Sequence, residues 1–346
     1  MKIDTPLTTY LSEYAPPPFQ ITHSELEFDL DAENTRIAVT HHVQRRDSGC
    51  RSLVLDFESV AVDSIYLNNE ALEPEHFSLD EPRLELGVDL DTFQLTINCH
   101  IDPSANTALS GLYQSGDMLC TQCEAEGFRR ILPSIDRPDN LGTYRVKLIG
   151  DPKAHPVMLC NGNLVESGTD GNKHFTVWED PFPKPTYLFA IVAGNLECME
   201  DTFKTADDRD VTLRFYARGR DIGKCTHAME SLKKSMLWDE QVYGRIYDLD
   251  LFNVVAVEDF NMGAMENKSL NIFNTKYVLA AADMASDQDF QNVEGVIGHE
   301  YFHNWSGNRV TCRDWFQLSL KEGFTVFRDQ EFSADMNSRA VSESKT

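Results

Sequence analysis

The spacing of three side chains near the end of the chain constrains its fold more than any other feature. His299 and His303 form an HExxH motif, and Glu322 follows after eighteen residues, 304–321. Residues four apart lie on one face of a helix, so both imidazoles point the same way. Glu322 lies on a segment whose pattern also predicts a helix. Together the three side chains predict a metal site built from two helices.

The residue types indicate catalytic zinc. Catalytic zinc takes three protein ligands and leaves one position open. Two neutral imidazoles and one carboxylate leave a net positive centre, which lowers the pKa of a water molecule and polarises a carbonyl group. Glu300 lies about 100° around the helix from His299 and can act as general base towards that water. We therefore predict one Zn²⁺ per chain, held by His299, His303 and Glu322; cobalt or manganese could replace it in vitro.

Two plainer interpretations compete with this prediction. The motif could belong to a solvated helix with incidental histidines, because HExxH arises by chance in about two such chains per hundred. The correctly spaced Glu322 makes that interpretation weaker. A closed structural zinc site needs a fourth ligand, and the sequence offers none at a matching spacing.

Composition limits the class of partner. A chain of 346 residues predicts two domains with sizeable cores. Its formal net charge of -25 and pI near 4.7 argue against nucleic acid and anionic membranes as partners. The acidity promotes solubility, and it would also favour substrates that carry a cationic amine. We therefore expect neither nucleic acid nor a membrane as a partner, and we expect a monomer.

The lack of export and membrane-spanning patterns in the sequence favours one cellular compartment. Residues 1–6 are followed by no apolar run, and no segment has the length of a transmembrane helix. The eight cysteines are scattered, as in proteins with reduced thiols. Asn304 begins an N-x-S pattern inside the predicted zinc helix, where a glycan would disrupt the site. We predict a cytoplasmic protein.

The first half of the chain has the alternating pattern of β strands. Leu26, Phe28 and Leu30 alternate with acidic residues, and the pattern recurs in residues 37–43, 53–57 and 93–99. Alternation of period two predicts antiparallel sheets with one solvated face. Residues 180–185 contain three prolines and cannot form a central strand. An apolar run follows them and ends at Gly194.

The second half changes to a mixed pattern. We predict strands over residues 211–216 and 250–257, and a helix over 225–242. Ser286 or Asp287 can cap a helix that runs through the HExxH motif and ends near Gly307. The predicted fold is multidomain, β followed by α/β. A β-rich domain spans residues 1–194 and a catalytic domain spans 195–346.

Longer motifs carry a family resemblance. Residues 263–267 read GAMEN and stand thirty-two residues ahead of His299. With the HExxH motif and Glu322, this arrangement resembles the zinc aminopeptidase N family. The strings 187–190, 260–268, 299–305 and 314–323 resemble the bacterial alanyl aminopeptidases within it. The resemblance extends over essentially the whole chain and matches the N-terminal part of family members.

The resemblance implies a fold and a set of roles. The implied fold is an N-terminal saddle-like β sandwich followed by a thermolysin-like catalytic domain. His299, His303 and Glu322 match the zinc ligands, and Glu300 matches the general base. The implied activity is hydrolysis of the N-terminal residue from peptides, with alanine, other apolar and basic residues preferred.

Further residues match the family's substrate-binding positions. Glu266 and Glu124 match two carboxylates that hold the free α-amine of the substrate. Two carboxylates around one ammonium give charge-assisted hydrogen bonds and place the first peptide bond over the metal. Gln122 matches a residue that lines the first substrate pocket, and Met262 one that cushions the first side chain. The remaining matches belong to the GAMEN segment, which could pair with the substrate as an added strand: Gly263, Ala264, Met265 and Asn267.

The chain departs from the family at its end. Family members continue through the rest of the catalytic domain and a helical domain, and they supply a tyrosine that stabilises the oxyanion. Residues 341–346 do not resemble that continuation. We therefore expect a truncated form with weak or absent activity, because losing an oxyanion donor costs about a hundred- to a thousand-fold in rate.

Three other functions remain as alternatives. A thermolysin-type endopeptidase shares HExxH and the later glutamate, but GAMEN and Glu124 argue against it. A non-catalytic module could bind peptide N-termini without turnover. Epoxide-hydrolase relatives share the zinc motif but differ in the segment equivalent to GAMEN.

Overall fold

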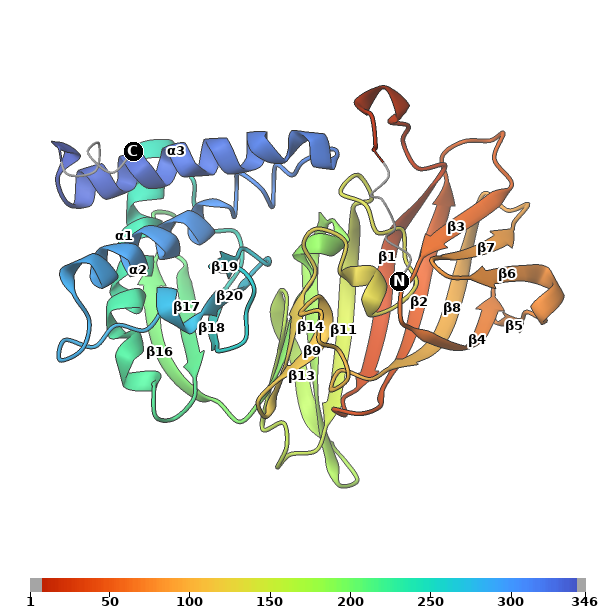
Figure 1. Ribbon diagram of the computed structural model, residues 1–346, viewed down its shortest axis with the longest axis horizontal. Coiled ribbons are helices and arrows are strands. Elements are labelled where there is room, and N and C mark those ends of the chain that lie inside the picture. Colours follow the sequence, from red (N-terminus) through yellow and green to blue (C-terminus); the bar gives the residue numbers. More distant parts are fainter. Residues whose placement is uncertain (1–7, 341–346) are drawn as a thin grey trace.

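The computed structural model describes residues 8–340 and consists of a β-rich part and a mixed part (Figure 1). The expectations about a signal sequence at residues 1–6 and about the tail at 341–346 fall outside the described residues. None of the helices in the described part of the chain combines the length and apolarity that a membrane crossing requires.

Three sheets make up the β-rich part. The largest has eight strands in the spatial order β13-β14-β11-β1-β2-β8-β4-β5. The other two sheets have the orders β12-β15-β10-β9 and β3-β7-β6. Their bounds are β1 (Phe19–Asp29), β2 (Thr35–Arg45), β3 (Ser52–Asp56), β4 (Ala61–Leu67), β5 (Glu70–Ala71), β6 (Phe77–Asp80), β7 (Arg83–Gly87), β8 (Thr92–Ile101), β9 (Gly111–Ser115), β10 (Met118–Gln122), β11 (Gly142–Gly150), β12 (Val157–Cys160), β13 (Asn163–Asp170), β14 (Lys173–Lys184) and β15 (Ile191–Gly194).

The alternating pattern correctly identified the buried face of this part. Leu26, Phe28 and Leu30 are all buried, and so are the apolar residues at alternate positions in β2, β3 and β8. These side chains join one continuous hydrophobic core. The prediction of purely antiparallel sheets was wrong at one pair, because β1 runs parallel to β11.

The proline-rich segment also differs from its prediction. Residues 180–184 continue β14, which lies between β13 and β11 in the largest sheet. Pro181 and Pro183 fall in an irregularity: the pairing with β11 jumps from Asp180 opposite Tyr144 to Lys184 opposite Gly142. The segment is tolerated because a proline in a bulge need not donate to the ladder.

Within the described residues, the mixed part holds a five-stranded sheet and three α-helices. The strand order is β16-β17-β18-β20-β19, and β17, β18 and β20 are parallel. Every residue of β18 is buried, as its apolar sequence predicted. The bounds are β16 (Glu197–Lys204), β17 (Asp210–Ala217), β18 (Leu251–Val257), β19 (Ala264–Met265), β20 (Leu270–Asn274), α1 (Thr226–Tyr243), α2 (Asp287–Phe302) and α3 (Leu318–Met336).

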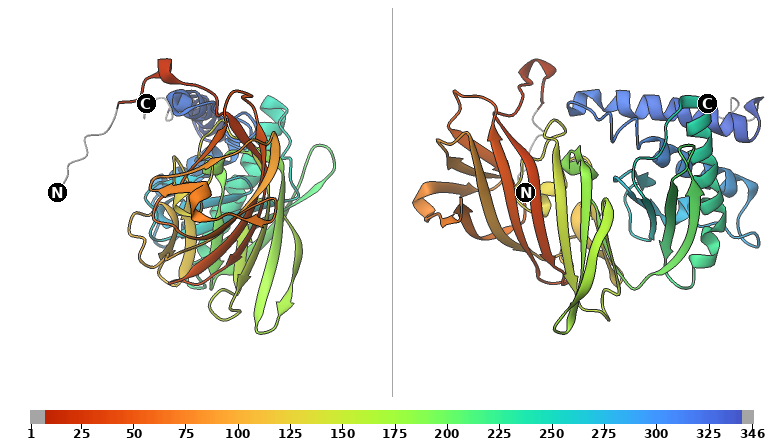
Figure 2. Two further views of the ribbon diagram at one scale, coloured as in Figure 1. Left: turned by 90° about the vertical axis from the view of Figure 1, so that its right-hand side faces the viewer. Right: turned by 180° about the vertical axis from the view of Figure 1, so that it is seen from behind.

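The three helices pack together beside this sheet. Met229, Leu232 and Met236 form the buried face of α1, as their spacing predicted, and lie in a second hydrophobic core with residues of α2 and α3. Helix α3 crosses over α2 at the top of the molecule and its first turn points towards the β-rich part (Figures 1 and 2). This crossing brings the segment with Glu322 over the HExxH motif.

The two parts meet along a packed interface. β15 ends at Gly194, and β16, which begins at Glu197, belongs to the other sheet. Leu251 and Val255 of β18 join the core of the β-rich part, so the two parts share apolar side chains. The domain boundary at residue 194 remains a prediction.

Candidate metal centre and catalytic site

Helix α2 positions the HExxH motif. Ser286 caps its first turn: the Ser286 hydroxyl accepts from the Asp289 amide, and the Asp289 carboxylate accepts from the Ser286 amide. This capping box fixes where the helix starts. The helix ends at Phe302 and not near Gly307 as predicted, so His303 is its C-cap residue. His303 keeps helical backbone angles, which is why its side chain still lies on the same face as His299.

Three candidate ligand atoms converge beside this helix. The Nε2 atoms of His299 and His303 are 2.9 Å apart, and Glu322 Oε2 lies 3.5 Å from the first and 3.3 Å from the second. Ligand atoms about 2.0–2.1 Å from a tetrahedral zinc would be about 3.3 Å from one another. The three atoms therefore have nearly the separations that one zinc ion requires.

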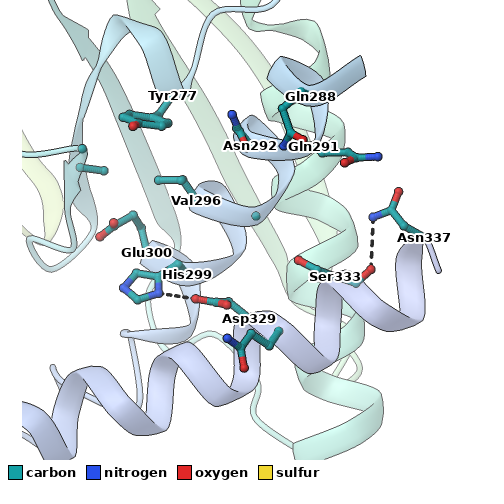
Figure 3. Close-up of a pocket in the computed structure, with 14 residues that line it drawn as sticks. Tyr277, Gln288, Gln291, Asn292, Val296, His299, Glu300, Asp329, Ser333 and Asn337 are labelled. Atoms are coloured by element: carbon teal, nitrogen blue, oxygen red, sulfur yellow. Dashed lines mark hydrogen bonds and ion pairs between the residues drawn. The ribbon is translucent and has the colours of Figure 1, made fainter. Parts of the chain in front are cut away.

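Both imidazoles are oriented through their other nitrogen. His299 Nδ1 lies 2.5 Å from Asp329 Oδ2 (Figure 3). His303 Nδ1 lies 2.9 Å from the carbonyl oxygen of Ser306. A carbonyl can only accept, so His303 Nδ1 carries the proton, which leaves the Nε2 lone pair available to a metal ion. A donor set of two such imidazoles and a carboxylate fits a zinc ion. Among the residues described, this trio is one of two groups with convergent ligand atoms.

Asp329 was not among the site residues predicted from the sequence. It lies seven residues after Glu322 on α3, which places both carboxylates on one face two turns apart. That spacing is the sequence signal that could have identified Asp329 as part of the site. Hydrogen bonds from Asp329 and Glu322 raise the pKa of His299 to about 10, against the lowering effect of burial.

Glu300 lies next to the ligand trio. It is buried, and its Oε2 atom has no hydrogen-bond partner among the described residues. Burial raises the pKa of Glu300 to about 8; His299 opposes the shift, while the carboxylates of Glu266 and Glu322 add to it. Its position beside the trio and its unpaired oxygen place Glu300 where it could exchange a proton with a water at the metal position.

A second cluster holds the carboxylates expected to bind the substrate amine. Glu124 comes from the turn after β10, and Glu266 follows β19. Their oxygens and a Glu322 oxygen lie within 4.8 Å of one another. The structure thus brings together residues more than a hundred positions apart in the chain.

Lys321 neutralises part of this cluster. Its ammonium donates to Glu124 Oε1 at 2.7 Å, to Glu266 Oε1, and lies 3.1 Å from Glu322 Oε1. The lysine is buried, and the charges of the surrounding carboxylates keep its pKa well above the usual value despite that burial. Lys321 was not predicted, because a lysine beside a glutamate on a helix normally marks a solvated face.

The two carboxyl groups respond differently to this shared lysine. Burial and the charge of Glu266 raise the pKa of Glu124 to about 7, although Lys321 opposes the shift. Burial also acts on Glu266, but the nearby Lys321 and His303 bring its pKa below the ordinary value. Glu266 therefore keeps its negative charge more firmly than Glu124.

The other predicted substrate-binding residues lie at the end of β10 and around β19. Gln122 is buried at the end of β10, and its Nε2 lies 3.4 Å from the Glu124 carbonyl oxygen. Met262 is half exposed ahead of β19. Asn267 is buried, with neither side-chain amide atom paired among the described residues. Gly263 directly precedes the edge strand β19, which consists of Ala264 and Met265 and pairs with β20 alone.

Comparisons with known proteins identify the family to which the chain is similar. Residues 20–188 match the peptidase M1 N-terminal domain, and residues 227–346 match the peptidase family M1 domain. Aminopeptidase N of Escherichia coli is 51% identical over 97% of this chain and 38% of its own length. Aminopeptidase N of Caulobacter vibrioides is 50% identical over 100% of this chain and 40% of its own length.

A solved structure is similar over the same region. Legionella pneumophila aminopeptidase A, in complex with aspartic acid, superposes with a TM-score of 0.91 at 34% identity, over 94% of this chain and 39% of that chain. The present chain thus spans about two-fifths of the length of the relatives it matches. Two domain matches in the family's order and about 50% identity over nearly all its residues show that the chain belongs to peptidase family M1.

Proposed function

We propose that this chain carries the zinc and amine-binding sites of an aminopeptidase, which hydrolyses the N-terminal residue from peptides. One observation carries the proposal. A trio with the separations of zinc ligands, His299, His303 and Glu322, lies directly beside two carboxylates, the buried Glu266 and the partly exposed Glu124. An endopeptidase has no use for two such carboxylates at that position, whereas an enzyme that recognises a charged N-terminus does.

The residues around the metal position have different chemical roles. Zinc, when bound by the trio, polarises the scissile carbonyl and makes water more acidic. Glu300 takes the proton from the attacking water and passes it to the leaving amine. Asp329 holds the His299 ring by its Nδ1 atom. The edge strand at Ala264 and Met265 can pair with the backbone of the substrate.

The charge of the carboxylate cluster leaves room for a substrate amine. Glu322 is assigned to the metal, so Glu266 and the ionised form of Glu124 carry two negative charges against the single positive charge of Lys321. One uncompensated charge remains, and an α-ammonium would neutralise it. Binding the ammonium there sets the distance to the metal, so the first peptide bond is the one that is cleaved.

The finer properties follow the family resemblance. We expect alanine, other apolar and basic residues at the first position, with Gln122 and Met262 lining that pocket. A cytoplasmic monomer remains our expectation. The activity of the whole M1 proteins is a proposal for this chain, since it spans about two-fifths of their length. For the 346 residues alone we expect weak or absent turnover.

The test combines metal content with turnover. Zinc would be quantified in the purified 346-residue chain and in Glu300→Gln, and both would be assayed with alanyl-p-nitroanilide. Stoichiometric zinc in both proteins, with any turnover lost in Glu300→Gln, is the expected result. Cleavage of an N-acetylated peptide at an internal bond would instead identify an endopeptidase. Peptide binding that survives zinc removal, without turnover, would identify a non-catalytic binding module.

A further inference from the structure

Two histidines face each other in the middle of the largest sheet. His23 of β1 is the register partner of His42 of β2, and the two strands are neighbours (Figure 1). A bulge follows Ile21, so that Ile21 and Ser24 are both buried while His23 and Glu25 lie on the solvent-facing side of β1. His42 is on the same side of β2 and is partly exposed. Both imidazoles are therefore accessible to an ion from solution.

The geometry of this histidine pair resembles that of the candidate metal centre. The ring centroids of His23 and His42 are 5.4 Å apart, and the rings meet edge to face at 68°. The rings of His299 and His303 are 4.6 Å apart and meet edge to face at 80°. Directly opposed residues of two antiparallel strands have Cβ atoms about 4.5–5.5 Å apart, which is close enough for two imidazoles to share one ion.

Glu25 adds a carboxylate beside the histidine pair. Its Oε1 atom lies 3.8 Å from His42 Nε2, which is too long for a hydrogen bond. His42 Nε2 is itself shielded from solvent and has no hydrogen-bond partner among the described residues. Metal–ligand bonds of about 2.0–2.2 Å to each atom would span up to about 4.2 Å, so one ion fits between the two atoms.

The surroundings of His23 favour the neutral ring that a metal requires. His23 Nδ1 lies 2.8 Å from Thr143 Oγ1 on the other neighbouring strand, β11. The hydroxyl can accept from this nitrogen, which leaves the lone pair on Nε2 for an ion. Burial and the charge of His42 lower the pKa of His23. The carboxylates of Glu25 and Glu179 oppose this shift, and the same negative charges would attract a metal cation.

We propose that His23, His42 and Glu25 form a second transition-metal site, which binds Zn²⁺ and joins β1 to β2. Two imidazoles and one carboxylate are a donor set that suits this ion. The ligand atoms of the trio at the candidate metal centre already lie within 4.8 Å of one another, whereas those of the second site do not. The second site is therefore the weaker one, because its side chains must turn and lose rotamer freedom when the ion binds.

The test is equilibrium dialysis of the whole chain against rising concentrations of free Zn²⁺. The parent should bind one equivalent tightly and a second one weakly. His23→Gln and His42→Gln should each weaken the second equivalent more than about tenfold, since losing even an outer partner of a ligand costs about 10- to 100-fold. His100→Gln is the matched control: His100 lies on the same face of the neighbouring strand β8, with its Nδ1 3.0 Å from the Asp63 carboxylate. It should leave both equivalents unchanged.

The variants separate the possible outcomes. Absence of a weak equivalent in the parent would overturn the proposal. So would a weak equivalent that survives both His23→Gln and His42→Gln, or one that His100→Gln weakens equally. The inference does not depend on the proposed aminopeptidase function. Absence of the tight equivalent from every protein would contradict the candidate metal centre alone, because the second site is identified by its dependence on His23 and His42.

Discussion

Lys321 Nζ donates to Glu124 Oε1 at 2.7 Å, across 197 positions of sequence. This ion pair joins the start of α3 to the turn after β10 in the β-rich part. The lysine side chain is 1% exposed and the glutamate side chain 11% exposed, so water screens the pair little. The stability of the interface between the two parts therefore depends on the charges of the carboxylates that are expected to bind the substrate amine.

Removing the lysine charge should destabilise the chain. Lys321→Met leaves the Glu124 and Glu266 carboxylates buried without their cation, which typically costs about 3–5 kcal/mol. Glu124→Gln should cost less, because Lys321 keeps Glu266 and Glu322 as partners. The double variant, Lys321→Met with Glu124→Gln, should show a coupling energy of about 0.5–3 kcal/mol in urea unfolding.

The control is Lys204→Met, which removes an exposed lysine paired with Asp208. It should change stability by less than about 0.5 kcal/mol. Similar losses for the two lysine variants would contradict the assigned role.

Asp329 should control metal affinity without touching the metal. Its carboxylate holds His299 Nδ1, and removing such an outer partner typically weakens metal binding about 10- to 100-fold. Asp329→Asn should therefore lose zinc to a competing chelator at about 10- to 100-fold lower chelator activity than the parent. Asp335→Asn alters another α3 carboxylate, which pairs with Trp238, and serves as the control. Equal zinc affinity of the two variants would show that Asp329 does not position His299.

The sequence predicted those features that depend on local patterns. Alternation identified the buried face at Leu26 and Phe28, and Ser286 marked the start of α2 because a capping box needs only four residues. Glu322 could be placed on a helix from its neighbours alone. Each of these features is decided within about one or two turns of chain.

Features that depend on contacts between residues far apart in the sequence could not be predicted from local patterns. Lys321 is buried because Glu124 and Glu266, from other elements, surround it, and its own neighbours suggest a solvated residue. The strand through Pro181 and Pro183 exists because a bulge removes them from the ladder with β11. In both cases tertiary contacts override the local preference.

A buried histidine should make stability sensitive to acid. His41 is fully buried: its Nε2 donates to the Pro133 carbonyl oxygen at 3.1 Å and its Nδ1 accepts from Ser24 Oγ at 2.8 Å. Burial lowers its pKa from 6.5 to about 4. The fold thus favours the neutral ring, and this contribution is complete above pH 6.5 and is lost as the pH falls towards 4. Its full size is about 3 kcal/mol.

The measurement compares unfolding free energies at two pH values. Between pH 7.5 and 5, the stability gap between the parent and His41→Gln should narrow by about 2 kcal/mol. Groups common to both proteins cancel in this difference. His76→Gln, at an exposed position, should leave the gap between parent and variant constant. A constant gap for His41→Gln, or an NMR titration of the His41 ring near pH 6.5, would refute the prediction.

Gly298 allows the close packing of α2 against α3 that brings Glu322 to the histidines. A Cβ atom at this position would lie 3.0 Å from Cδ1 and Cε1 of Phe332 and 3.3 Å from Ser235 Oγ. The Phe332 ring is fully buried between Trp238 and Phe302, so it cannot move away at low cost. Gly298→Ala should therefore destabilise the chain by about 1–3 kcal/mol, although alanine favours a helix by nearly 1 kcal/mol over glycine.

Two further variants separate packing from helix propensity. Gly323→Ala, on α3, meets no atom within 4 Å, so it should be neutral or stabilise the chain by up to about 1 kcal/mol. Phe332→Leu introduced with Gly298→Ala should cost less than the sum of the two single changes, because the smaller side chain makes room for the new methyl group. Additive losses in thermal or urea unfolding would mean that the contact with Phe332 is not what requires glycine at position 298.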